Sequence, residues 1–461
     1  MARSVALRHP IYKNIRMVGG RKAGKAAVRG KVTVISTLTP SLSRQRERES
    51  IIFSPSRHGV MRLVGDAWVN GNYASMEATA ISERLQQIIA EEIKAKGPLP
   101  FARFMGHCLY HPQYGYYASG RGRRGREGDY YTSPTVHPIF GALMGRQLVQ
   151  MWRILGAGAF EIVEMGGGEG YLCLDILNYL QQEEPQCYDL LLYRMVERSP
   201  VVIERQRRLL ASHEARVAWH RPEEMANQEV QRCFLSNELV DSFPVHRVVM
   251  KAGALQEVYV DLDKGEFKEV QADPSTPELV GYFRRLGIRL AEGQQAEVNL
   301  EAARWIQRVA KGLARGFVIT IDYGYPADEF YSPLRPAGTF LCYQGHKALS
   351  DPYTHLGLQD MTSHVDFTSL IAAGEEVGLK CTGLVPQYRF LFALGILERL
   401  AQLGKGKGEE EALNERLTIK NLILPGGLGE CFKVLIQHKG IAKPQLEGLK
   451  RPLKGDIPAF F

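Results

Sequence analysis

Apolar and polar residues follow one another in blocks along the middle of the chain, and the blocks alternate between two periods. Residues 159–166 (AFEIVEMG) form an apolar run of strand length, whereas residues 171–182 (YLCLDILNYLQQ) repeat their apolar positions every three or four residues, as an amphipathic helix does. The same patterns downstream predict a helix at 200–213 and strands at 190–197, 215–220, 233–240 and 316–324. Strands that alternate with helices predict an α/β fold with a doubly wound, mostly parallel sheet.

Other elements flank this region. The stretch 107–141 is rich in aromatic residues and glycine, which predicts a packed cap or lid, and residues 250–300 predict a hairpin insertion with a turn at Lys264-Gly265. The remaining patterns predict a helix that ends at Gly97-Pro98 (78–100), a second helix (142–155) and a late edge strand (429–439). The chain thus divides into a basic leader (1–76), an N-terminal cap (77–145), a core with the insertion (146–440) and a C-terminal tail (441–461).

The charge of the chain is concentrated in its leader. The net charge of +8 comes from 58 basic and 50 acidic residues, and residues 1–76 contribute 14 of the former and 3 of the latter. The remainder is therefore close to neutral, at −3, and a high isoelectric point is no argument for a nucleic-acid partner. The leader has no acidic residue before Glu47, which fits three interpretations: a disordered basic arm, a mitochondrial-type transit peptide, or an extension absent from a mature protein that starts at Met61 or Met76.

Composition excludes several classes of protein. Hydrophobic residues make up 45% of the chain and charged residues 23%, which is globular rather than disordered or fibrous. No apolar run reaches the length of about 18 residues that a membrane span needs. The 7 cysteines include no CxxC pair, which favours a reducing compartment over a disulfide framework or zinc knuckle. We expect no metal site.

The glycine-rich segment after the first strand carries the first chemical signal. Glu164 ends the strand and glycines occupy Gly166, Gly168 and Gly170 just before a helix, where the backbone can approach a ligand closely. The spacing is neither that of a dinucleotide fingerprint nor that of a P-loop. A carboxylate at 164 would repel a pyrophosphate but suits a cationic ligand. The alternative is a structural turn with no ligand.

The second strand ends at Glu197. In a doubly wound sheet, a carboxylate there lies beside the glycine loop and can bind both ribose hydroxyls. A cationic, ribose-bearing ligand on this pair of motifs indicates S-adenosylmethionine (SAM) as cofactor. A solvated carboxylate at a strand end is the alternative for Glu197.

The fourth core strand ends in Asn237 and Glu238, followed by Asp241. An amide and a carboxylate at this edge can hold a planar nitrogen nucleophile, and an arginine guanidinium, which stays protonated, needs such a carboxylate to be fixed for attack. The alternative is a capping pair at a turn. Asp322, at the end of another strand, is a candidate for contact with the substrate, and a strand-end cap is equally consistent with its position.

The set of motifs resembles the MidA-type class I SAM-dependent methyltransferases, a family that includes a mitochondrial complex I assembly factor that methylates arginine. The resemblance covers about residues 78–440 and is carried by GPLPFARFM, YYASG, GDYYTSPTVHPIFG, EIVEMGGGEGYL, LLLYRMVERSP, FLSNELVDSFPVHRV, FVITIDYG, GTFLCYQGH, LGLQDMTSHVDFTSL and LILPGGLGECFKVL. It implies a Rossmann-like class I methyltransferase core with an N-terminal cap or lid, SAM as cofactor, and protein arginine dimethylation during complex I assembly. By position it implies a SAM loop (Glu164, Gly166, Gly168), a ribose ligand (Glu197), a substrate-facing pair (Asn237, Glu238) and a lid from Asp129 to Pro134 that includes Tyr130 and Tyr131.

Alternatives remain open at the level of function. A protein arginine as substrate competes with a small hydroxy or carboxylate metabolite on the same fold, and with a SAM-binding assembly chaperone that does not turn over. Nucleic-acid methylation is the weakest, because the body is near neutral and no NPPY-like tetrad follows the fourth strand. We expect a protein partner, no specific nucleic acid and no membrane span. The location is the mitochondrial matrix if the source is eukaryotic and the cytoplasm if it is bacterial.

Overall fold

The computed structural model describes residues 59–117, 133–225, 230–345, 347–403, 409–424 and 428–450. The chain divides into two units, Met1–Met76 and Glu77–Phe461. Helix α1 (Gly59–Lys96) begins in the first unit, and everything else described below belongs to the second. The predicted lid residues Asp129, Tyr130 and Tyr131 lie outside the described residues, as does most of the leader.

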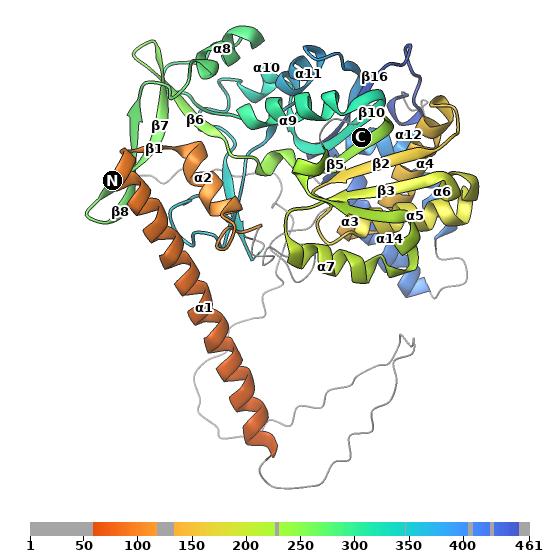
Figure 1. Cartoon of the computed structure of the whole chain (residues 1–461), viewed down its shortest axis with the longest axis horizontal. Helices are drawn as coiled ribbons and strands as arrows, with labels where there is room; N and C mark the ends of the chain where they lie inside the picture. The colour runs from red at the N-terminus through yellow and green to blue at the C-terminus, as the bar shows by residue number, and fades with distance from the viewer. Residues whose placement is uncertain are drawn as a thin grey trace, which may run out of the picture. The chain divides into compact units, whose positions relative to one another are not determined.

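The core of the second unit is a central sheet whose strands run in the order β15-β16-β10-β5-β2-β3-β4 (Figure 1). All neighbours in this order are parallel except β16, which is antiparallel to β10 and β15. The predicted doubly wound, mostly parallel sheet is therefore confirmed. The strands span Phe160–Met165 (β2), Leu191–Val196 (β3), Val217–His220 (β4), Val230–Asn237 (β5), Leu313–Tyr325 (β10), Lys380–Pro386 (β15) and Phe432–Lys439 (β16), with Val365–Asp366 (β14) added beside β10.

The prediction of an edge strand at 429–439 is wrong. This segment forms β16, which is paired on both sides and largely buried, and the edge of the sheet is β15. Strand β15 (KCTGLVP) escaped prediction because its Gly383 and Pro386 interrupt a short apolar run. Order along the sheet depends on contacts between distant segments, which periodicity alone does not report.

Helices cover both faces of this sheet because its strands are apolar on both sides. Ile162 and Leu235 pack on one face with helices α4 (Ile139–Ile154) and α5 (Tyr171–Glu183). The neighbouring residues along the strands, such as Val163, point to the other face and pack with the helices α9 (Leu300–Lys311) and α11 (Phe367–Glu375). This two-sided burial is what makes parallel strands read as continuous apolar runs.

The remaining helices have four to ten residues, apart from α14, which has fifteen. They span Phe101–Tyr110 (α2), Ser133–Val136 (α3), Pro185–Leu190 (α6), Pro200–Leu209 (α7), Pro277–Leu286 (α8), Ala327–Phe330 (α10), Gln387–Ala393 (α12), Ile396–Gln402 (α13), Glu409–Ile423 (α14) and Leu428–Cys431 (α15). The predicted helix at 200–213 is thus shorter than expected, and its last residues belong to a 3₁₀ turn, η2 (Ala211–Arg216).

The hairpin predicted within 250–300 is present and belongs to a second sheet of order β1-β7-β6-β9, with β8 beside β7. Its turn has positive φ at Lys264 (51°) and Gly265 (91°), as a two-residue hairpin turn requires. A third, small sheet has the order β12-β11-β13. Their strands span Leu99–Pro100 (β1), His246–Lys251 (β6), Ala254–Asp263 (β7), Glu266–Ala272 (β8), Gln295–Val298 (β9), Leu341–Gln344 (β11), Lys347–Leu349 (β12) and Asp360–Thr362 (β13).

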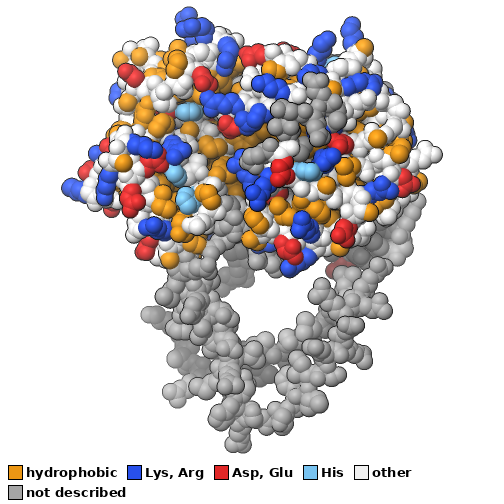
Figure 2. Space-filling model, in the orientation of Figure 1, with side chains coloured by type: hydrophobic (Ala, Val, Ile, Leu, Met, Phe, Trp, Pro, Cys, Tyr) orange, Lys and Arg blue, Asp and Glu red, His pale blue; other side chains and the backbone are white. Residues whose placement is uncertain are grey.

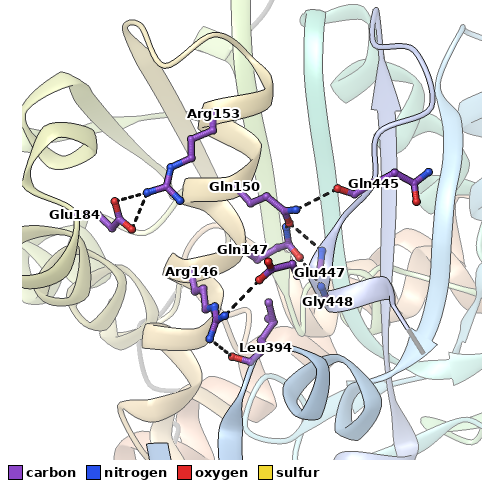
Figure 3. A network of polar contacts seen from close by, with 9 residues as sticks. All are labelled: Arg146, Gln147, Gln150, Arg153, Glu184, Leu394, Gln445, Glu447 and Gly448. Atoms are coloured by element: carbon purple, nitrogen blue, oxygen red, sulfur yellow. Dashed lines mark hydrogen bonds and ion pairs between the residues drawn. The ribbon is translucent and has the colours of Figure 1, made fainter. Parts of the chain in front are cut away.

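The C-terminal segment is fastened to helix α4 by two glutamines (Figure 3). Gln147 Oε1 accepts the Gly448 N–H at 3.0 Å, and Gln150 Oε1 accepts the Glu447 N–H at 2.9 Å. Arg146 Nη1 donates to the carbonyl at the end of α12, and its Nη2 lies 3.4 Å from the Glu447 carboxylate. These contacts hold α4, α12 and the C-terminal segment as one block.

The surface of the described part carries mixed charge. On the face drawn in Figure 2, basic and acidic side chains are interspersed with apolar ones. Within the described ranges, no helix is both long enough and apolar enough to cross a lipid bilayer.

Candidate active site

The carboxyl ends of β2, β3, β5 and β10 meet at one edge of the central sheet, because these strands are parallel. At this edge a pocket holds about 330 Å³ of empty space, part of it open to solvent. It brings together three residues that the sequence singled out, Glu164, Gly166 and Asn237. The other residues that line it are Pro134, Thr135, Gly167, Glu169, Tyr171 and Leu172.

The glycine loop closes one side of the pocket. Gly166 has φ of +69°, which strains any other residue, and a Cβ there would lie 2.7 Å from Leu239 Cδ1, so the leucine would have to shift. Its N–H donates to the carbonyl of Val196 at 3.1 Å, which ties the loop to the end of β3. Gly168 and Gly170 shape the same loop but do not line the pocket.

Glu164 lies buried at the floor of the loop. Its Oε2 accepts a hydrogen bond of 2.9 Å from the hydroxyl of Tyr193, a residue of the neighbouring strand β3. Burial, together with the charge of Glu164, raises the pKa of Tyr193 well above its usual value, so the phenol stays protonated and remains a donor. The tyrosine therefore fixes the orientation of the glutamate carboxylate.

Glu197 follows β3 directly and is half-buried. Its Oε1 accepts the N–H groups of Arg198 (2.7 Å) and Ser199 (3.0 Å), which shapes the turn into α7. It lies beside the glycine loop, since the residue before it binds Gly166, but it is not among the residues that line the pocket.

Asn237 and Glu238 form one unit at the end of β5. The Asn237 amide nitrogen donates to Glu238 Oε1 at 2.9 Å, and the backbone N–H of Ser133 approaches the same oxygen at 3.4 Å. Asn237 Oδ1 is buried and has no hydrogen-bond partner. Glu238 itself has φ of +52°, a conformation that costs a non-glycine residue about 1 kcal/mol or more and that concentrates at functional sites.

Asp322 holds the turn that follows Glu238. Its Oδ2 accepts the N–H groups of Val240 (3.0 Å) and Asp241 (3.3 Å), and its side chain is fully buried. Burial raises the pKa of Asp322 well above its usual value, and the negative charges of Asp241 and Glu238 raise it further. These hydrogen bonds are those of a strand-end cap, and contact of Asp322 with the substrate stays a prediction. Asp241, also buried, accepts a hydrogen bond of 2.5 Å from the Tyr323 hydroxyl, and neither aspartate lines the pocket.

Sequence reasoning missed Gln206, a fully buried residue of helix α7. Its Nε2 donates to the Gly168 carbonyl at 2.7 Å and its Oε1 accepts from Trp219 Nε1 at 3.0 Å. The side chain thus holds the backbone of the glycine loop at Gly168. The sequence gives no signal for this role, because Gln206 lies in a helix whose neighbouring residues are arginines.

Metal-binding geometry is not found in the described ranges, where no three His, Cys, Asp or Glu side chains are grouped to hold an ion. The two acidic residues of the segment 360–366 make hydrogen bonds within the fold. Asp360 accepts a hydrogen bond from the Tyr117 hydroxyl, and Asp366 caps helix α11 through the Ser369 N–H.

Comparison with known families and structures agrees with this geometry. Residues 143–385 match the model of a family described as putative S-adenosyl-L-methionine-dependent methyltransferases. A Drosophila melanogaster protein named protein arginine methyltransferase NDUFAF7 homolog, mitochondrial, is 30% identical over 82% of this chain and 91% of its own length. The human protein arginine methyltransferase NDUFAF7, mitochondrial, is 27% identical over 76% of this chain and 82% of its own.

A crystal structure from Burkholderia thailandensis has the same fold. This COG1565 superfamily member, described as a likely methyl transferase bound to S-adenosyl-homocysteine, is 31% identical with a TM-score of 0.75, and the match covers 82% of this chain and 97% of that one. The residues present here fit the same group: the Glu164 carboxylate is held in one orientation beside a loop whose glycine has positive φ and lines the pocket. The chain therefore belongs to this family of S-adenosyl-L-methionine-dependent methyltransferases.

Proposed function

We propose that this enzyme methylates an arginine guanidinium of a protein, by in-line transfer from SAM. The observation that carries the proposal is the buried oxygen of Asn237, which lines the cofactor pocket without a partner and is joined to the carboxylate of Glu238. An unpaired buried acceptor costs about 1–3 kcal/mol unless a ligand supplies a donor. The N–H groups of a guanidinium are such donors.

The charge of the site supports a cationic substrate. Glu238, Asp241 and Asp322 are all buried, and the pKa of Asp322 is raised partly by the other two charges. A guanidinium would relieve this repulsion, whereas a carboxylate metabolite would add to it. The site therefore favours a cation over the acidic small molecules that the same fold can accept.

Each residue has a part in the proposed reaction. SAM supplies an electrophilic methyl group, and the loop at Gly166 with Glu164 would hold this cofactor while Glu197 would bind its ribose. Glu238 would pair with the protonated guanidinium, and Asn237 Oδ1 would accept an N–H of the attacking nitrogen. This fixes the nitrogen in line with the methyl group, which is the main contribution a protein makes to such a transfer. As the new N–C bond forms and the bond from sulfur to the methyl group breaks, the proton lost by the nitrogen would pass to the Glu238 carboxylate, during or after the transfer.

The names of the relatives support the wider setting. Relatives from Drosophila and human are named as mitochondrial protein arginine methyltransferases. We extend this to the present chain as a protein substrate and a mitochondrial location in a eukaryotic source. The matrix, and a role in the assembly of a respiratory complex, are what the sequence resemblance implies. The corresponding location in a bacterium is the cytoplasm.

Transfer of a labelled methyl group tests the proposal. Wild-type protein, Glu238→Gln and the surface control Glu266→Gln are incubated with methyl-tritiated SAM and a lysate from cells that lack the gene. We expect label in the protein fraction with the wild type and the control, and at least a 100-fold loss with Glu238→Gln, because the neutral amide cannot pair with a guanidinium. Binding of SAM, measured by calorimetry, should stay within about threefold.

Two other outcomes would replace the proposal. Label that appears only in the low-molecular-weight fraction would identify a small-molecule methyltransferase. A Glu238→Gln variant that restores the cellular role without any transfer would identify an assembly chaperone.

A further inference from the structure

Gln387 is a buried residue near the site that the reaction described above does not use. It follows β15 directly, as the first residue of helix α12, and β15 runs in the same direction as β10. Gln387 therefore lies at the same carboxyl edge of the sheet as Asn237 and Glu238. Its side chain is fully buried, and its Nε2 has no hydrogen-bond partner.

The other end of this amide leads to Glu238 through one residue. The hydroxyl of Ser133 donates to Gln387 Oε1 at 3.2 Å, and the backbone N–H of Ser133 points to Glu238 Oε1 at 3.4 Å. Ser133 is itself fully buried and begins α3, whose next two residues, Pro134 and Thr135, line the cofactor pocket. Ser133 is thus held from both sides.

The helix that carries Gln387 is also held by the C-terminal segment and by helix α4. Helix α12 contains the buried Phe390, on which Gly448 packs, and Gly448 is bonded to Gln147 of helix α4. The carbonyl of Leu394, the residue after α12, accepts a hydrogen bond from Arg146 of helix α4 (Figure 3). A side chain on such a braced element can fix its partner to within the fraction of an ångström that catalysis needs.

We propose that Gln387 is a positioning residue for the transfer reaction, which acts through Ser133 to place the carboxylate of Glu238. The inference rests on the proposed function, since it assigns a role within that site. What distinguishes Gln387 from other buried amides is its place: it lies at the carboxyl edge of the sheet and is joined through Ser133 to Glu238 Oε1. Its unpaired Nε2 adds a cost in stability at this position.

The test separates positioning from stability. The variants are Gln387→Leu, Ser133→Ala and the double variant, which removes both hydrogen-bonding partners and is close to neutral for stability on that account. We expect kcat for methyl transfer to protein to fall about 10-fold in each single variant and no further in the double variant, because both act on one contact. The Kd for SAM should stay within twofold and the KM for the protein within threefold.

A matched control is available at Gln437, another fully buried side chain whose amide has no partner. It lies on β16, five residues from Phe432, which pairs with Tyr323 at the edge of the sheet that carries the site. Gln437 is therefore roughly 16 Å along the strand from that edge. Gln437→Leu should leave kcat unchanged.

Three results would overturn the inference: an unchanged kcat in Gln387→Leu, an equal loss in Gln437→Leu, or losses that multiply in the double variant. All of these are read against an active wild type. A wild type that transfers no methyl group to protein would instead refute the proposed function, and this inference with it.

Discussion

At the scale of single residues, the glycine loop is the part of the site that tolerates substitution least. Gly166 combines a positive φ with contact distance to Leu239, so an added methyl group must move the leucine or the loop. We expect Gly166→Ala to lower SAM affinity more than 10-fold, since the loop is part of the pocket wall. Calorimetry with SAM measures this.

The control for this variant is Gly158→Ala, since Gly158 has open space around it and an ordinary φ. It should bind SAM as the wild type does. Equal affinity in Gly166→Ala and wild type would remove the loop from the cofactor site.

Asp366 gives a prediction about pH. Burial raises its pKa from 3.8 to about 6, against the hydrogen bonds from Tyr282 and Ser369. The folded protein therefore binds this proton more tightly than the unfolded chain does. Its contribution to stability is present below pH 4 and is lost as pH rises through 6.

Asp366→Asn removes this titration and keeps the oxygen that caps α11. We expect the free energy of unfolding of the variant, relative to wild type, to rise by about 2 kcal/mol between pH 4 and pH 7. Urea unfolding at both pH values measures the difference. A difference that is constant with pH would show that Asp366 ionises normally in the folded state.

The candidate site was predictable where its signals are local. Glu164, Gly166, Asn237 and Glu238 stand next to strand ends in the sequence, and parallel strands must bring their carboxyl ends together. Roles that arise from contacts between distant segments were not predictable. Gln206 is 38 residues from the loop it braces, and Asp322 is 82 residues from the Val240 amide it caps.

At the scale of secondary-structure elements, the alternation of strands and helices is readable from periodicity, and the position of an element in the sheet is not. The segment 429–439 was correctly predicted as a strand and wrongly placed at the edge. Its partner β15 went unrecognised because Gly383 and Pro386 interrupt its apolar run, and the strands of the third sheet because each has only three or four residues.

The attachment of the C-terminal segment gives a prediction at this scale. A Cβ at Gly448 would lie 2.3 Å from the ring of Phe390, which is fully buried and cannot move aside. We expect Gly448→Ala to lower the free energy of unfolding by about 1–3 kcal/mol. Denaturant titration measures it.

The control for Gly448→Ala is a glycine-to-alanine variant that is expected to raise the free energy of unfolding instead of lowering it. Gly281 lies inside helix α8 with nothing within 4 Å of an added Cβ. Gly281→Ala should therefore raise stability by up to about 1 kcal/mol. A neutral Gly448→Ala would mean that α12 is not held by the C-terminal segment.

At the scale of the whole molecule, the separate parts converge on one edge of the sheet. The loop after β2 lines the pocket, and the end of β5 presents the Asn237 amide and the Glu238 carboxylate. Ser133 of α3 connects Glu238 to Gln387 of α12. The near-neutral body and the basic leader show that the charge of the chain says little about its substrate. The buried acidic residues of the site, Glu238, Asp241 and Asp322, are the better indication that the substrate is a cation.

The chemical identity of the methylated residue tests the central claim most directly. Protein labelled with methyl-tritiated SAM is hydrolysed in acid, and the labelled amino acids are separated by chromatography. The account predicts that the label co-elutes with methylated arginine and that it disappears with Glu238→Gln. Label that co-elutes with methylated lysine, label released as methanol or methylamine from an ester or a glutamine side chain, or label unaffected by that substitution, would contradict it.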